Sequence, residues 1–445
     1  MMIEYTLLTG FYLLSVWLIA IYIYSDYQKQ AFSFHLLFSL IYLVIFYLGF
    51  PFSMAMALGF DSPLAEPDIL FITLFAMLAG YLIYWISYRF FAGTIRRQKQ
   101  QAVQNQQNFV KLSANLTACF LLLIAIGSLA WFIFLNGWLL FELEKYSQIF
   151  SASIQNVWLK RFFYFFLPAL LILFFLDQNK RVWWFFLILG IVLGGLNYIA
   201  VGGTRANLAM AVLLFFLLGL YTNYVSFKAL VGAGCVMIGA MFLLALVRYG
   251  LKVNGSEALF TFLYLTRDTF SPWENLAKIL SYPVEPQGLM PIVRDFYVYI
   301  PDGLWQAKPS YIVNTANYFT RELLGNFSGL AISPTLLGSF YIMGGLPMIV
   351  LGMALVGWII QSFDRLFSYA KYHQNKSNSA IIQAYCMANL FNFVVLVREG
   401  LDAFISRWVF FSIVFLLCWC VAKLITLSFE AGLSRIGVDK NDSNG

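Results

Sequence analysis

The chain has 445 residues, of which 61% are hydrophobic, 19% aromatic and only 11% charged. Globular domains usually hold about 25% charged residues, so this composition leaves too few polar side chains to cover a surface that faces water. A soluble protein is therefore excluded, and the formal net charge of +7 does not indicate nucleic-acid binding. We expect the chain to lie in a lipid bilayer.

Apolar runs long enough to cross a bilayer recur along the whole chain. At about 20 residues per span, the hydropathy pattern predicts an all-α polytopic membrane protein with about eleven transmembrane helices. The expected spans are 5–25, 31–53, 69–90, 114–136, 161–177, 183–201, 207–224, 227–248, 336–362, 379–397 and 404–428. The chain then divides into spans one to eight, one large loop, spans nine to eleven and a tail, at 1–248, 249–335, 336–428 and 429–445.

The charges of the loops predict the orientation. Segment 89–111 contains several Lys and Arg and no acid, which places it in the cytoplasm under the positive-inside rule. By alternation, the N-terminus and loop 249–335 lie on the outer side, and the C-terminus is cytoplasmic. The outer loop that carries Asp61, Glu66 and Asp68 supports this orientation, since it has no Lys or Arg. Prolines distributed along loop 249–335 predict short helices separated by turns.

Nearly half of the Lys and Arg residues fall on the outer side, against the usual bias. Two of them, Arg205 and Arg398, lie in outer loops of only a few residues. Such a group of cations suggests a shared anionic ligand, and a lipid pyrophosphate fits because Arg binds phosphate through a planar, permanently charged fork. The alternative is ordinary ion pairing with outer acids. The candidate ligands of the pyrophosphate are Lys160, Arg161, Arg205, Arg248, Arg267, Arg294, Arg398 and Arg407.

Spacing predicts which of these arginines already have a partner. Arg398 and Asp402 have the i,i+4 spacing of an ion pair, which would leave Glu399 without a local partner. In the dipeptides Arg267–Asp268 and Arg294–Asp295, neighbouring side chains on a helix point about 100° apart, so we expect the two members to serve different partners. Glu399 is therefore the preferred general base, and Asp268 and Asp295 are its rivals.

Aromatic residues share the large loop with the arginines. Trp273, Tyr297 and Tyr318 are candidates for stacking on sugar rings, although Trp and Tyr are also usual at membrane interfaces. On the outer side, the sequence shows no His, Cys or carboxylate cluster with the spacing of metal ligands, because His35 and His373 both fall toward the cytoplasm. We therefore expect no metal and no cofactor.

Several polar strings resemble those of one protein family. They are YSQIFS at 146–151, LKRFFYFF at 159–166, VGGTRAN at 201–207, FLYLTRDTFSPWENLA at 262–277, PIVRDFYV at 291–298, ANYFT at 316–320, SGLAISPT at 328–335 and REGLD at 398–402. The chain resembles the WzyE family, the Wzy-type enterobacterial common antigen polymerases, from its first span to its last. The resemblance implies a GT-C-type glycosyltransferase fold in the bacterial inner membrane, with its active site on the periplasmic side.

The resemblance also implies substrates and partners. The substrates would be trisaccharides on undecaprenyl pyrophosphate, which a flippase delivers, and a Wzz-type co-polymerase would set the chain length. The repeat unit contains a uronic acid, so the basic outer face suits both its carboxylate and the pyrophosphate. A flippase or transporter is the alternative of another class, but such proteins tend to show internal repeats and midplane charges, which this sequence lacks. An O-antigen ligase-type transferase differs only in its acceptor.

Overall fold

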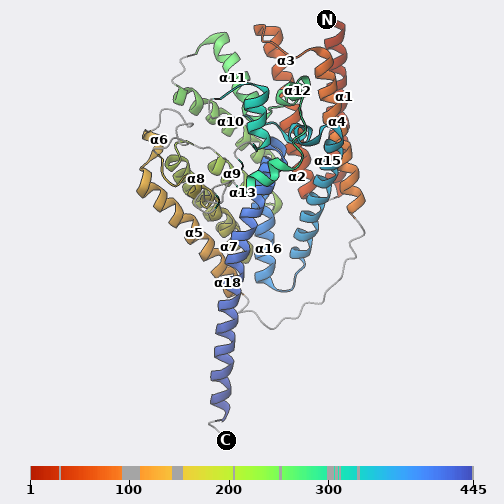
Figure 1. Ribbon diagram of the computed structural model, residues 1–445. Helices are drawn as coiled ribbons and strands as arrows, with labels where there is room; N and C mark the ends of the chain where they lie inside the picture. Colours follow the sequence, from red (N-terminus) through yellow and green to blue (C-terminus); the bar gives the residue numbers. More distant parts are fainter. Residues whose placement is uncertain are drawn as a thin grey trace. The chain divides into compact units, whose positions relative to one another are not determined.

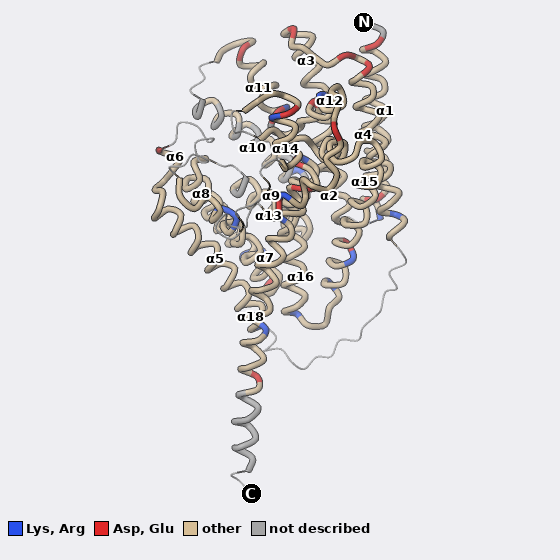
Figure 2. The backbone as a smooth tube through the Cα atoms, viewed as in Figure 1, with Lys and Arg blue, Asp and Glu red and all other residues tan. Residues whose placement is uncertain are grey.

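The structure, a computed structural model, describes residues 2–29, 32–92, 111–142, 154–203, 206–249, 253–297, 305, 309, 312–327 and 331–442. Within these residues it is built from helices without strands, and nine helical segments are long and apolar enough to cross a membrane. The prediction of an all-α polytopic membrane protein is confirmed. Figure 2 shows one such segment, α5 (Leu112–Asn136), as a tube without charged residues. The expected spans 207–224 and 227–248 coincide with α9 (Ala206–Tyr221) and α10 (Phe227–Tyr249).

The chain divides into two compact units. The first comprises Met1–Ile95, Val231–Asp364 and Phe391–Trp408, and the second comprises Arg96–Leu230, Arg365–Leu390 and Val409–Gly445. The first contains α1 (Met2–Lys29), α2 (Phe34–Tyr47), α3 (Gly49–Phe60), α4 (Pro67–Phe91), α11 (Gly255–Phe270), α12 (Glu274–Ser281), α13 (Met290–Tyr297), α14 (Thr315–Tyr318), the π-helix η5 (Phe319–Leu323) and α17 (Leu390–Glu399). Helices α15 (Leu336–Lys371) and α18 (Leu401–Asp442) contribute to both units.

The second membrane span consists of α2 and α3, which join at Leu48 (Figure 1). Pro51 explains the join, because proline has no N–H to donate to the carbonyl of Tyr47, four residues earlier. The hydroxyl of Tyr12 on α1 donates to that carbonyl instead, at 3.2 Å. A side-chain hydrogen bond thus replaces a main-chain hydrogen bond. Without it, a carbonyl of an apolar span would be left unpaired.

A buried polar network connects four helices of the first unit. The His35 ring lies with Nδ1 2.7 Å from the Tyr84 hydroxyl and with Nε2 3.0 Å from Asp26. Asp364 on α15 accepts hydrogen bonds from the main-chain N–H groups of Phe34, at 2.7 Å, and His35, at 3.1 Å. These two N–H groups belong to the first turn of α2, where a helix leaves its donors unpaired. The network therefore satisfies the first donors of a membrane span and ties α2 to α15.

Helix α15 is interrupted near its start. Gly344 and Gly345 leave the helical conformation, Gly345 with a φ of +66°, and Pro347 cannot donate to the carbonyl of Met343. The carbonyls of Met343 and Ile342 instead accept from the N–H groups of Gly288, at 2.8 Å, and Gln287, at 2.9 Å. The segment that precedes α13 is thus hydrogen-bonded to a membrane span, which fixes the start of α13.

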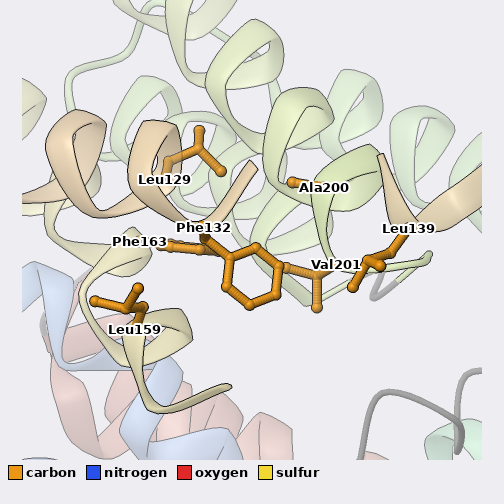
Figure 3. Packing of buried hydrophobic residues seen from close by; sticks show 7 residues of the cluster. All are labelled: Leu129, Phe132, Leu139, Leu159, Phe163, Ala200 and Val201. Atoms are coloured by element: carbon orange, nitrogen blue, oxygen red, sulfur yellow. The ribbon is translucent and has the colours of Figure 1, made fainter. Parts of the chain in front are cut away.

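The second unit packs its helices around an aromatic and aliphatic core. Its elements are α5, α6 (Leu139–Glu142), the 3-10 helices η3 (Val157–Arg161) and η4 (Phe163–Phe165), α7 (Phe166–Leu176), α8 (Lys180–Ala200), α9 and α16 (Lys376–Ala388). Figure 3 shows part of the core, in which Phe132 of α5 lies beside Phe163 of η4 and Val201 after α8. The Tyr164 hydroxyl donates to the carbonyl of Ala388 at the end of α16, so a side chain again completes a helix terminus.

Candidate functional site

The REGLD string forms a tight corner between α17 and α18. Gly400 has a φ of +111°, and a Cβ at this position would lie 2.5 Å from the side chain of Ser339, so the corner requires glycine. The hydroxyl of Ser339 accepts the N–H of Leu401 at 3.3 Å, and the Thr335 N–H donates to the carbonyl of Arg398 at 3.1 Å. The corner is therefore fixed against the start of α15, and with it the charged residues that it carries.

Asp402 bonds to α14 and not to Arg398. Its carboxylate is buried and accepts hydrogen bonds from the N–H and the hydroxyl of Thr315, at 2.8 and 2.9 Å. Arg398 makes no ion pair in the described part of the chain, and its buried Nε has no hydrogen-bond partner. The predicted Arg398–Asp402 pair is therefore wrong. The reason is Gly400, whose positive φ ends one helix between the two residues, so that the i,i+4 geometry of a continuous helix does not apply.

Glu399 has a partner on α18. Nη2 of Arg407 lies 2.6 Å from Oε2 of Glu399, and the Arg407 guanidinium also lies 5.8 Å from the centre of the Phe391 ring. The expectation that Glu399 lacks a local partner is therefore wrong. The two charged side chains remain 32% and 38% exposed, so the pair can be reached from outside the protein.

Helix α13 brings a further ion pair to the same corner. Nη1 of Arg294 lies 3.1 Å from Oδ1 of Asp295, although the sequence predicted different partners for the two. The Arg side chain is long enough to bend back across the angle between neighbouring positions. Asp295 is buried, and its carbonyl accepts from the Ser406 hydroxyl at 3.4 Å. Helix α13 is thereby joined to the first turns of α18.

The other dipeptide behaves as its spacing predicts. Arg267 donates to Glu274 at 2.8 Å and lies 5.3 Å from the centre of the Tyr264 ring. Asp268 is exposed. Arg267 thus pairs with a residue other than its neighbour, and its charge is neutralised across the turn between α11 and α12.

The three aromatic candidates fill the interior of the first unit. Trp273 is fully buried, and its indole N–H donates to the Ser53 hydroxyl at 3.2 Å. Tyr297 donates to the carbonyl of Pro309 at 2.8 Å, and Tyr318 belongs to a hydrophobic core cluster. The prediction that these rings stack on sugars does not agree with their burial. Folding of the large loop uses them as core residues, because aromatic rings bury more apolar area than any other side chains.

The other candidate cations are divided between the second unit and residues that the structure does not describe. Lys160 and Arg161 lie on η3 of the second unit, where the Arg161 guanidinium lies 5.6 Å from the centre of the Phe410 ring. Arg205 and the side chain of Arg248 lie outside the described residues. Among the residues described, no group of three or more His, Cys, Asp or Glu could hold a metal ion.

Acidic and basic residues thus lie close together around α13, α14 and the α17–α18 corner (Figure 2). The described part of the chain is thus a polytopic membrane protein with a cluster of charged side chains, and such groups often mark functional sites in membrane proteins. Residues 2–442 match the family model described as WzyE protein, O-antigen assembly polymerase, so the chain belongs to the WzyE family. Membership makes it a polysaccharide polymerase with a glycosyltransferase-type activity. No solved structure matches the chain.

Proposed function

We propose that the protein polymerises the trisaccharide repeat units of enterobacterial common antigen on undecaprenyl pyrophosphate, at the periplasmic face of the inner membrane. The α17–α18 corner, α13 and α14 form the reaction site in this proposal. Family membership supports the polymerase activity, and the charged cluster supports the choice of site. The large loop and both ends of the chain are assigned to their sides by the distribution of Lys and Arg.

The main support for the proposal is the unpaired side chain of Arg398. The carbonyl of this residue is fixed by Thr335, whereas its guanidinium has a buried Nε without a hydrogen-bond partner. A buried N–H donor without a hydrogen-bond partner costs about 1–3 kcal/mol. A phosphate oxygen that accepted from this N–H would remove the cost. Arg294 and Arg407, whose guanidinium groups contact carboxylates, would add positive charge on either side of the bound pyrophosphate.

The reaction requires one proton transfer and one displacement. The acceptor hydroxyl attacks the anomeric carbon of the growing glycan, the new glycosidic C–O bond forms, and the bond from that carbon to the pyrophosphate oxygen breaks. Undecaprenyl pyrophosphate leaves, and the arginines stabilise the charge that develops on it. Glu399 takes the proton of the acceptor hydroxyl. It is better placed than Asp295, because its side chain is 32% exposed and that of Asp295 only 9%.

The wider assignment follows from the same chemistry. Arginines that hold the pyrophosphate would replace a divalent cation in neutralising it, so the proposed reaction is metal-independent. The carboxylate of the uronic acid in the repeat unit would bind to the other Lys and Arg residues of the outer side. A Wzz-type co-polymerase and the repeat-unit flippase are the proposed protein partners.

The proposal is tested with purified protein and lipid-linked repeat units. A ladder of longer lipid-linked oligosaccharides is expected from the wild type, and Arg398→Ala should abolish it without reducing the amount of folded protein. Transfer onto lipid A core in place of a second unit would identify a ligase instead. Movement of the unit across a vesicle membrane without elongation would identify a flippase.

A further inference from the structure

The second unit contains a hollow that the polymerase reaction does not use. It has a volume of about 520 Å³, within the range of pockets that hold small molecules. Three membrane spans line it with one end each: the start of α5, the end of α7 and the start of α8. The lining residues are Lys111, Asn115, Leu173, Leu176, Asp177, Arg181, Val182, Phe185 and Phe186.

The lining is divided into a charged end and an apolar end. Arg181 and Phe185 are four residues apart on α8 and thus share a face, and the rise of about 1.5 Å per residue separates them by roughly 6 Å along the helix. Lys111 lies at the very start of α5. Both cations therefore lie at the level where an apolar span begins, and the phenylalanines lie deeper along the span.

Neither cation of the hollow has a neutralising partner among the residues that the structure describes. Within the described residues, Lys111 and Arg181 form no ion pair, and both side chains are exposed. The single carboxylate of the lining, Asp177, also makes no ion pair there. Phe185 is 60% exposed, so the apolar wall is open as well. The hollow thus offers two cations, one acid and an uncovered apolar wall.

We propose that this hollow binds one anionic phospholipid of the surrounding bilayer. Lys111 and Arg181 would hold the phosphate diester, and an acyl chain would lie along Leu173, Phe185 and Phe186. The amphipathic lining selects a lipid over a free anion, because inorganic phosphate would leave the phenylalanine wall uncovered. Ordinary Lys and Arg residues at span ends also attract anionic lipids in general, but they lack a hollow that holds a single molecule. The proposal does not depend on the polymerase function.

Native mass spectrometry of the full-length protein in detergent tests the proposal. Titration with dioleoylphosphatidylglycerol should give one lipid bound more tightly than dioleoylphosphatidylcholine. Lys111→Gln and Arg181→Gln should each weaken phosphatidylglycerol binding about five-fold, and the double variant about thirty-fold. These factors correspond to the loss of about 1 kcal/mol of attraction to the anionic lipid for each cation removed. Asp177→Asn should strengthen binding, because it removes the only negative charge of the lining.

The neighbouring Lys180 supplies the matched control. It is exposed on the same helix turn but is not part of the lining, so Lys180→Gln changes the net charge equally and should leave the affinity unchanged. Equal binding of the two lipids would overturn the proposal, as would a loss with Lys180→Gln as large as that with Arg181→Gln. Displacement of the lipid by millimolar inorganic phosphate would show a site for a free anion and would also overturn it.

Discussion

Replacing Glu399 with Gln separates a structural role from a chemical one. The change keeps the shape of the side chain and an oxygen that can still accept a hydrogen bond from Arg407. In the wild type, Nη2 of Arg407 lies 2.6 Å from Oε2 of Glu399. It removes the negative charge and the ability to accept a proton. If Glu399 is the general base, the rate of polymerisation should fall about 10²- to 10⁴-fold, while the lipid-linked unit still binds.

The structural role sets a much smaller limit. The two side chains of the Glu399–Arg407 pair are 32% and 38% exposed, and ion pairs of this kind contribute about 0.2–1 kcal/mol. Loss of the whole pair would therefore reduce the folded or correctly arranged population by no more than about five-fold. The expected chemical effect exceeds this limit by more than an order of magnitude, so the two roles give distinguishable results.

The assay is the initial rate of oligosaccharide formation by equal amounts of purified, monodisperse protein. Glu274→Gln is the control, because it removes a carboxylate from the 2.8 Å pair with Arg267 without touching the α17–α18 corner. These two side chains are only 15% and 17% exposed, so the variant is compared at equal amounts of folded protein, and its rate should then stay within the five-fold margin given above for a structural role. Asp268→Asn and Asp295→Asn test the rival bases. A Glu399→Gln rate within that five-fold margin would refute the assignment, and a large loss in one rival would transfer the role to it.

The other expectations concern the arginine site, its corner and the topology. Arg398→Lys keeps the charge but loses the fork, so it should impair polymerisation at normal protein abundance, and full polymer formation would show that this arginine is dispensable. Gly400→Ala should lower stability by about 1–3 kcal/mol and reduce the thermal midpoint. The addition of Ser339→Gly should not restore the midpoint fully, because it relieves the contact but removes the acceptor of the Leu401 N–H. EDTA should not stop the purified enzyme; a loss that Mg²⁺ restores would contradict the proposed use of arginines. An alkaline phosphatase fusion near Pro286 should be active and one near Gln104 inactive, and the opposite pattern would invert the topology.

The membrane spans could be predicted because their signal is local and long. About 20 apolar residues in a row specify a helix in a bilayer whatever the rest of the chain does. The interruptions within spans follow from Pro51 and Pro347, which remove one N–H each. Their repair could not be predicted, since the Tyr12 hydroxyl and the N–H of Gly288 come from distant segments.

The candidate site was predicted less completely than the spans. The strings around Arg294 and Arg398 do lie on elements that contact α18, but their pairing depends on one backbone angle at Gly400. Spacing rules assume a continuous helix, and they fail where a positive φ turns the chain. Thr315 was missed as the partner of Asp402 because a hydroxyl and a main-chain N–H carry no charge pattern; its position before the ANYFT string is the sole signal in the sequence.

The sequence predicted sugar stacking for three aromatic rings that the fold buries in its interior. Composition shows that Trp273, Tyr297 and Tyr318 share a segment with arginines, yet it cannot show which faces of that segment turn inward. All three rings are less than 10% exposed. A loop of nearly ninety residues must bury apolar area to hold a defined shape, and its largest aromatic residues are the first to be used for this.

The main-chain bonds between residues 287–288 and the interrupted part of α15 determine which substitutions this junction tolerates. Both bonds use N–H groups of Gln287 and Gly288 and carbonyls of Ile342 and Met343, so no side chain takes part in recognition. The Gln287 side chain takes no part in these two bonds and donates instead to the carbonyl of Glu285, at 2.9 Å. Proline at this position would delete the main-chain donor and leave a carbonyl in a membrane span unpaired. The junction is thus expected to tolerate side-chain changes other than proline at residue 287, but not at residue 288, whose φ of +59° favours glycine.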